Sequence, residues 1–149
     1  MSRDARPGAG QRVVPPESRF TMAFNVDIVA AARANSSFRE VLSTGPHAQV
    51  VVMSIPPGEE IGAETHDHLD QVLVFVDGVG VARLGDEESA VSAGRMVLVP
   101  AGIHHNVVNT GPADLRLYTV YAPPQHAPGT VHRTKAEADA DEADHFVSG

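Results

Sequence analysis

Residues 94–109 read GRMVLVPAGIHHNVVN and combine two short apolar segments with the turn residues between them. Segments 95–99 and 105–108 are rich in valine, a residue that favours β-strands. Pro100 and Gly102 lie between the two segments, and both residue types are typical of turns. The stretch therefore predicts two β-strands joined by a short loop.

The same pattern of short apolar segments and turns extends on both sides of this stretch. Residues 27–35 differ, because they begin with an acidic residue and are rich in alanine, which predicts one short helix. The remaining predicted strands are rich in Val, Leu and Tyr and are bounded by glycine or proline turns: 49–55, 71–76, 80–84 and 115–121. Short strands at a spacing of about ten residues, with a single helix, predict an all-β barrel or sandwich.

The length and composition limit the class of protein. With 149 residues, and about 150 residues in a typical domain, the chain is expected to form one domain. No cysteine is present, which excludes disulfides and thiolate ligands or nucleophiles. The 11 Lys and Arg stand against 19 Asp and Glu, a net charge of −8 that disfavours nucleic acid and anionic membrane surfaces as partners. Without a secretory signal or a membrane-spanning apolar run, we expect a cytoplasmic protein.

The two ends of the chain differ from its centre. Residues 1–19 carry repeated proline and glycine without an apolar period, which predicts a disordered arm. Residues 20–134 form the predicted single domain, with the barrel core at about 49–123. Residues 135–149 are rich in acidic residues, and we expect a flexible, solvated tail. Met22 is an alternative start of translation.

A more specific pattern lies within the opening stretch. Five of its residues stand at the spacing G-x5-P-x-G-x2-H-x3-N: Gly94, Pro100, Gly102, His105 and Asn109. This spacing resembles the second signature of the cupin superfamily, with every position filled. Residues 118–124 also resemble the tyrosine-proline ending of small bacterial single-domain cupins, so the resemblance covers roughly residues 49–123. It implies a double-stranded β-helix of about six to eight strands, with a metal ion in the mouth of the barrel.

The first cupin signature, G-x5-H-x-H-x3 or 4-E-x6-G, is matched upstream with two departures. Gly58, His66 and Gly78 stand at their expected places. Glu64 replaces the first histidine, and Gln71 replaces the glutamate. The resemblance therefore implies a metal ion held by four side chains: Glu64, His66, Gln71 and His105.

The residue types suit such a site. Glu64, His66 and His68 are each two residues apart and can all face the barrel interior if the strand reaches that far, whereas Gln71 joins them only after a turn at 67–70. Imidazole and carboxylate groups together bind first-row divalent metals, so we expect Fe, Mn, Ni, Co or Zn as the single metal cofactor. Four protein ligands leave positions open in an octahedral sphere for a substrate or ligand.

The role of His68 has two interpretations. His66 and His68 form a literal His-x-His pair, in which His68 would replace Glu64 as a ligand. The spacing to Gln71 favours Glu64 instead, which leaves His68 as a pocket base and the candidate catalytic residue. The other histidines are expected outside the site, one on the opposite face of its strand (His104) and the rest as hydrogen-bonded structural residues: His47, His126, His132 and His145.

Three functions from different classes fit these features. The first is a metal enzyme acting on a small organic molecule, as an oxygenase or as a Lewis-acid isomerase, lyase or hydrolase. The second is a metal-dependent module that binds or senses a small molecule without turnover, and the third is a metal-free structural cupin. The filled second signature favours a metal site, and analogy with the fold favours an enzyme.

Two expectations concern the segments that flank the core. Residues 20–45 are long enough to lie across a neighbouring subunit, and the resemblance also implies a homodimer. Residues 121–134 contain prolines that hinder strand pairing, yet they are less polar than the tail that follows. We expect them to form an ordered strap on the barrel wall.

Overall fold

The computed structural model describes residues 24–146, so the predicted arm at 1–19 lies outside the described residues. Two short helices flank the strands, α1 (Ile28–Ala34) and α2 (Lys135–Ala140). The strands follow in chain order as β1 (Arg39–Thr44), β2 (Gln49–Ile55), β3 (Asp70–Asp77), β4 (Val79–Leu84), β5 (Glu87–Ser92), β6 (Met96–Val99), β7 (His105–Asn109), β8 (Leu115–Ala122) and β9 (Val131–His132). The six predicted strand segments coincide with β2, β3, β4, β6, β7 and β8.

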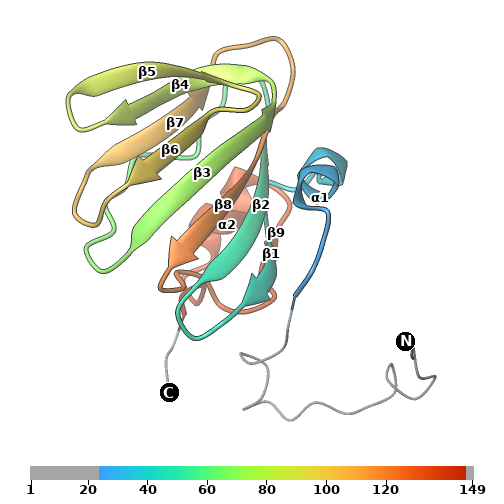
Figure 1. Ribbon diagram of the computed structural model, residues 1–149, viewed down its shortest axis with the longest axis vertical. Helices are drawn as coiled ribbons and strands as arrows, with labels where there is room; N and C mark the ends of the chain where they lie inside the picture. The colour runs from blue at the N-terminus through green and yellow to red at the C-terminus, as the bar shows by residue number, and fades with distance from the viewer. Residues whose placement is uncertain (1–23, 147–149) are drawn as a thin grey trace.

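The strands form two antiparallel sheets that face each other (Figure 1). The larger sheet has the order β6-β3-β8-β2-β1-β9, and the smaller sheet has the order β5-β4-β7. This arrangement confirms the all-β prediction. Among residues 24–146, no helix is long and apolar enough to cross a membrane.

Three strands lack a clear signal in the sequence. β5 has the sequence EESAVS and buries only Val91, so its pairing with β4 holds it in place rather than an apolar pattern. β9 is a two-residue strand on the edge of the larger sheet. Residues 39–44, which we expected to reach a neighbouring subunit, instead form β1 and pair with β2 of the same chain.

Helix α1 packs on the outer face of the larger sheet (Figure 1). Its N-cap is Asp27, whose side chain accepts a hydrogen bond of 3.0 Å from the backbone N–H of Ala30. The buried side chain of Ala32 joins Val52 and Val76 in a small apolar cluster on this face. The predicted helix at 27–35 is thus present, with its two ends acting as caps.

The space between the sheets is apolar at one end and polar at the other. Along β8, the side chains of Leu115 and Leu117 point into the main hydrophobic core. Farther along the same face of the strand, Thr119 and Tyr121 are also buried but carry hydroxyl groups. The polar end of the barrel therefore offers buried groups that can hydrogen-bond or bind a ligand.

The C-terminal segment corrects the expectation of a solvated tail. Residues 135–140 form α2, and the side chain of Asp144 is only 6% exposed, because it contacts His126 at 2.7 Å between Oδ2 and Nδ1. Its other oxygen, Oδ1, accepts a hydrogen bond of 3.0 Å from the backbone N–H of Ala127. Acidic residues here do more than solvate the chain, since one of them anchors it.

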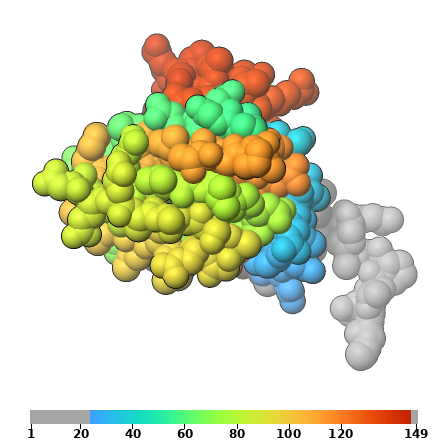
Figure 2. Space-filling model, turned by 90° about the horizontal axis from the view of Figure 1, so that it is seen from above, coloured from blue at the N-terminus to red at the C-terminus, as the bar shows by residue number. Residues whose placement is uncertain are grey.

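The strap predicted at 121–134 is ordered, and part of it forms β9 against β1. His132 of this strand contacts Asp141 at 2.9 Å between Nε2 and Oδ2. Figure 2 shows the red C-terminal residues gathered at one edge of the molecule, opposite the yellow strands. The strap and the start of the tail therefore form one packed unit.

We predict that Asp144→Asn lowers the free energy of unfolding by about 1.5–3 kcal/mol at pH 7, because it removes a buried charge-assisted hydrogen bond. Urea denaturation measures the change. The matched control is Asp139→Asn, on exposed α2, where the ion pair with Lys135 lies at the surface and contributes about 0–1 kcal/mol. Equal loss in both variants would contradict the anchoring role.

The same pair makes this difference depend on pH. Burial alone would raise the pKa of Asp144, but the hydrogen bond and charge of His126 and the Ala127 N–H outweigh it and lower the pKa from 3.8 to about 2. A carboxyl group whose pKa is lower in the folded state stabilises the protein at pH values above its unfolded pKa. This stabilisation is lost as the pH falls toward the folded pKa of about 2. The difference in free energy of unfolding between wild type and Asp144→Asn should therefore disappear between about pH 4 and pH 2.

Candidate metal centre

Three of the four predicted ligands come together at the polar end of the barrel. One ligand atom from each of Glu64, His66 and His105 lies within 4.8 Å of the others. Glu64 and His66 come from the segment between β2 and β3, and His105 begins β7. Glu64, rather than His68, therefore accompanies the two histidines.

Backbone pairing explains why Glu64 and His105 meet. Their N–H and C=O groups exchange two hydrogen bonds of 2.9 Å, which form an isolated antiparallel bridge. Side chains of residues paired in this way lie next to each other on one face. The pairing extends along β7, since the N–H of Ile61 donates to the carbonyl of Val107 at 2.9 Å. The segment before Glu64 thus behaves as an extra strand of the smaller sheet.

His66 is held by the turn between β6 and β7. Its backbone carbonyl accepts a hydrogen bond of 2.8 Å from the N–H of Gly102, in the turn that precedes β7. The His66 ring lies 5.4 Å from the ring of His105, measured between centroids. The two signature motifs of the sequence are therefore joined by backbone contacts as well as by side chains.

The ring of His105 is oriented for ligation. Its Nδ1 lies 2.9 Å from the carbonyl oxygen of Ile103, so Nδ1 carries the proton and donates it. This assignment leaves a lone pair on Nε2, which is buried and has no hydrogen-bond partner. A buried acceptor without a partner is costly, and a metal ion supplies the missing interaction.

Glu64 is ready to bind a cation as a carboxylate. Burial acts to raise the pKa of Glu64, but the hydrogen bond from His66, at 3.0 Å between Nε2 and Oε1, and nearby positive charges outweigh it, so the pKa is lowered overall. The side chain of Glu64 is 36% exposed, whereas that of His66 is 10% exposed. The centre therefore opens to solvent on the Glu64 side.

Gln71 lies on β3 inside the barrel. Its Nε2 donates to the hydroxyl of Thr119 at 3.1 Å, and this hydroxyl in turn donates to the carbonyl of Val72 at 2.8 Å. Because the Thr119 hydroxyl donates its proton to Val72, it accepts from Gln71, and the amide atom that faces it is therefore the nitrogen. The other amide atom, Oε1, is buried without a hydrogen-bond partner. Its carbonyl oxygen has the chemistry of a ligand, and its binding to the metal stays a prediction.

His68 does not join the three clustered ligands. It is exposed and lines a pocket that also contains His47, Leu69, Pro123 and His145, but none of the three clustered residues. The structure therefore gives no support to a ligand or base role for His68 at this centre. His104 is exposed, with Nδ1 at 2.9 Å from the Thr65 hydroxyl, outside the centre as expected.

Two of the histidines expected to be structural are confirmed as hydrogen-bonded residues, since His126 pairs with Asp144 and His132 pairs with Asp141. Burial lowers the pKa of His126, although Asp144 opposes this effect. Asn109, the last residue of the second signature, caps a turn by accepting a hydrogen bond of 2.8 Å from the N–H of Gly111.

Two interior residues near the centre are not among the predicted site residues: Tyr121, which lies in the tyrosine-proline segment, and Arg39. Tyr121 packs edge-on against the rings of His66, at 6.0 Å, and His126, at 5.0 Å. Burial raises the pKa of Tyr121, so its hydroxyl is protonated at neutral pH. Arg39 is also buried, with 7% of its surface exposed. The alternation of buried residues along β8 is a signal from which the burial of Tyr121 could be predicted. The burial of Arg39 follows from its place in β1, a strand that the sequence does not predict.

Comparison with known proteins places this fold and site in a family. A model of the cupin domain matches residues 51–121. The uncharacterized protein YrkC of Bacillus subtilis (strain 168) is 46% identical over 125 residues, which cover 80% of this chain and 67% of that protein. The uncharacterized protein L612 of Acanthamoeba polyphaga mimivirus is 33% identical over 118 residues, which cover 76% of this chain and 74% of that protein.

A solved structure agrees with these matches. The crystal structure of BH2720 from Bacillus halodurans has a TM-score of 0.80 and 46% sequence identity, and the match covers 80% of this chain and 96% of that chain. The sequence relatives, the domain match and the shared double-stranded β-helix show that this chain belongs to the cupin family.

Proposed function

We propose that this cupin binds one divalent transition metal and acts as an enzyme on a small organic molecule. The observation that carries the proposal is the buried, unpartnered Nε2 of His105 beside the Glu64–His66 pair. Two imidazoles and one carboxylate suit Fe, Mn, Ni, Co or Zn better than Ca or Mg, which prefer more oxygen ligands. The same donor set is typical of non-haem Fe(II) oxygenases, and this favours an oxygenase over a Lewis-acid isomerase or lyase.

The residues of the chain have separate tasks in this proposal. Glu64, His66 and His105 hold the metal, and Gln71 adds its amide oxygen. Such a metal supplies redox or Lewis-acid chemistry when bound. Tyr121, protonated and buried against His66, offers a hydroxyl to a bound molecule. The exposed side of Glu64 lets a small substrate enter.

Metal content tests the ligand set. We predict that Glu64→Gln, His66→Ala and His105→Ala purify nearly metal-free from cells, because the first replaces the anionic ligand by a weaker neutral one and the other two each remove an imidazole. Metal per protomer is measured by mass spectrometry on protein made without an affinity tag. His68→Ala and His104→Ala are matched controls, since both histidines are exposed and lie outside the cluster. Loss of metal in His68→Ala with full loading of Glu64→Gln would show that the ligand set is wrong.

Turnover separates an enzyme from the alternative, a metal-dependent module that binds or senses a small molecule. We expect Fe(II)-loaded protein to consume O₂ with at least one compound of a panel of small organic acids, phenols and amines. Oxygen-electrode measurements should show no consumption with Glu64→Gln. Compounds that raise the melting temperature of loaded protein without any O₂ consumption or product would support the binding module instead.

A homodimer is a separate part of the proposal, and an apolar row on the outer face of the larger sheet supports it. Cross-strand register places Leu98, Val72, Val120 and Val50 side by side across four strands. Leu98 is 52% exposed. Apolar surface of this kind on a soluble protein often marks a contact with another molecule.

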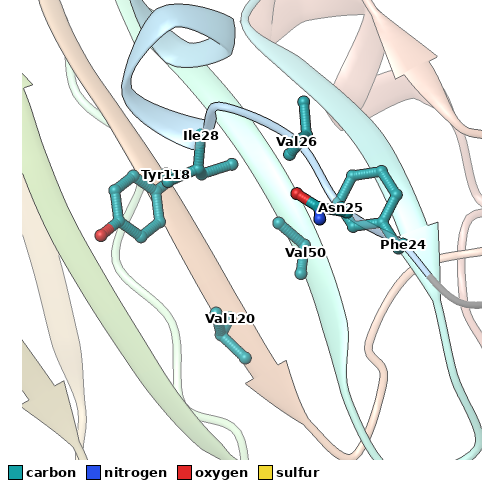
Figure 3. Close-up of a pocket in the computed structure, with 7 residues that line it drawn as sticks. All are labelled: Phe24, Asn25, Val26, Ile28, Val50, Tyr118 and Val120. Carbon is teal, nitrogen blue, oxygen red and sulfur yellow. The ribbon is translucent and has the colours of Figure 1, made fainter. Parts of the chain in front are cut away.

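A groove of about 330 Å³ continues this row beneath the segment that leads into α1. It is lined by Phe24, Asn25, Val26, Ile28, Val50, Tyr118 and Val120 (Figure 3). Figure 3 shows Val50 and Val120 on neighbouring strands below Phe24 and Val26. A second copy of the chain can therefore cover both the row and the mouth of this groove.

We predict that Leu98→Lys converts the dimer into a monomer, because it places a charge in the most exposed residue of the apolar row. Light scattering at micromolar concentration measures the mass. Val131→Lys is the control, since Val131 is also apolar and 50% exposed but lies on β9, at the opposite edge of the sheet and outside the row. A monomeric wild type would contradict the proposed assembly. The small-molecule substrate, the lack of nucleic-acid or membrane partners and the cytoplasmic location stay predictions.

A further inference from the structure

Arg39 places a positive charge inside the barrel. It begins β1 and stands opposite Met53 of β2 and His132 of β9. Met53 belongs to the main core, so Arg39, in register with it, points into the same interior. A guanidinium is always protonated in a protein, and its charge is therefore buried with it.

The guanidinium has no carboxylate partner. Its Nη1 lies 3.4 Å from Nδ1 of His132, and its carbon lies 5.1 Å from the centre of the Phe38 ring. Nε is buried without a hydrogen-bond partner. Among the ion pairs of residues 24–146, none includes Arg39. A buried charge is costly unless it is paired, so this geometry is typical of a group that waits for an anion.

The two carboxylates on whose pKa the charge of Arg39 acts are already engaged. Asp144 binds His126 and the backbone of Ala127. Glu64 binds His66 and, in the proposed function, the metal ion. Asp141 reaches Arg39 only through His132. No carboxylate of the described residues therefore pairs directly with the guanidinium, and a substrate anion would supply that partner.

Tyr121 connects Arg39 to the metal centre. Its hydroxyl interacts with Arg39, and its ring packs against that of His66. An anion held by Arg39 would thus lie on the same side of the barrel as the three clustered ligands. This position is suited to orient a substrate whose other end reaches the metal.

We infer that Arg39 binds the carboxylate of a small organic-acid substrate next to the Glu64–His66–His105 centre. The inference rests on the proposed function for its metal and names the substrate class of that site. A carboxylate matches the planar fork of the guanidinium with two parallel hydrogen bonds. Phosphate also matches the guanidinium fork. It carries more charge and more polar oxygens than a carboxylate, however, and a single unpaired guanidinium would compensate less of its desolvation cost in the interior.

Acetate is the probe that tests this subsite. Titration of ¹⁵N-labelled wild type with acetate should move one arginine Nε–H resonance downfield, and acetamide, the neutral analogue, should not. Arg39→Gln should weaken acetate binding about 10- to 100-fold, as expected for loss of a hydrogen bond to a charged group. Arg83→Gln, which changes an exposed arginine paired with Glu88, is the control and should bind as wild type does.

Several results would overturn the inference. These are equal acetate affinity in wild type and Arg39→Gln, no shifted Nε–H resonance in wild type, and tighter binding of inorganic phosphate than of acetate. The resonance is measured on wild type, so the test holds even where Arg39→Gln fails to fold. Running it on chelator-treated and metal-loaded protein separates the two proposals, because acetate binding at Arg39 in a protein that takes up no metal would refute only the metal centre.

Discussion

Two backbone hydrogen bonds between Glu64 and His105 hold the candidate centre together. They convert the segment before Glu64 into a strand-like neighbour of β7, and they bring a carboxylate next to an imidazole on the same face. Because the constraint lies in the main chain, the relative backbone positions of these two residues do not depend on side-chain contacts. A further backbone hydrogen bond, from the N–H of Gly102 to the carbonyl of His66, ties the second histidine to the turn before β7.

The polar groups inside the barrel fall into two kinds. Gln49 is fully engaged, since its amide donates to the carbonyl of His126 and its oxygen accepts from the N–H of the same residue. By contrast, Oε1 of Gln71 and Nε2 of His105 are buried without partners. Natural proteins leave few such groups unsatisfied, and those that remain often mark a binding site. The contrast distinguishes structural amides from groups that face a ligand.

The C-terminal segment couples stability to the site. His126 contacts both Asp144 in the tail and the ring of Tyr121, which itself packs on His66. His132 links Arg39 to Asp141 in the same way. The tail therefore covers part of the polar end of the barrel, near Arg39 and His126, and limits the access of water that would screen their charges. Its anchoring and the electrostatics of the centre depend on the same few side chains.

The sequence by itself determined the six central strands, the helix at 27–35 and the ligand pattern around Glu64, His66 and His105, because alternation, turn residues and motif spacing are local properties. Only the tertiary structure decided that His68 lies outside the cluster, that Arg39 is buried and that Asp144 anchors the tail. These features arise from contacts between residues far apart in the chain. An acidic, alanine-rich segment has the sequence pattern of a solvated tail. The pairing of Asp144 with the buried His126 cannot be predicted from that local pattern, because the two residues lie in different parts of the chain.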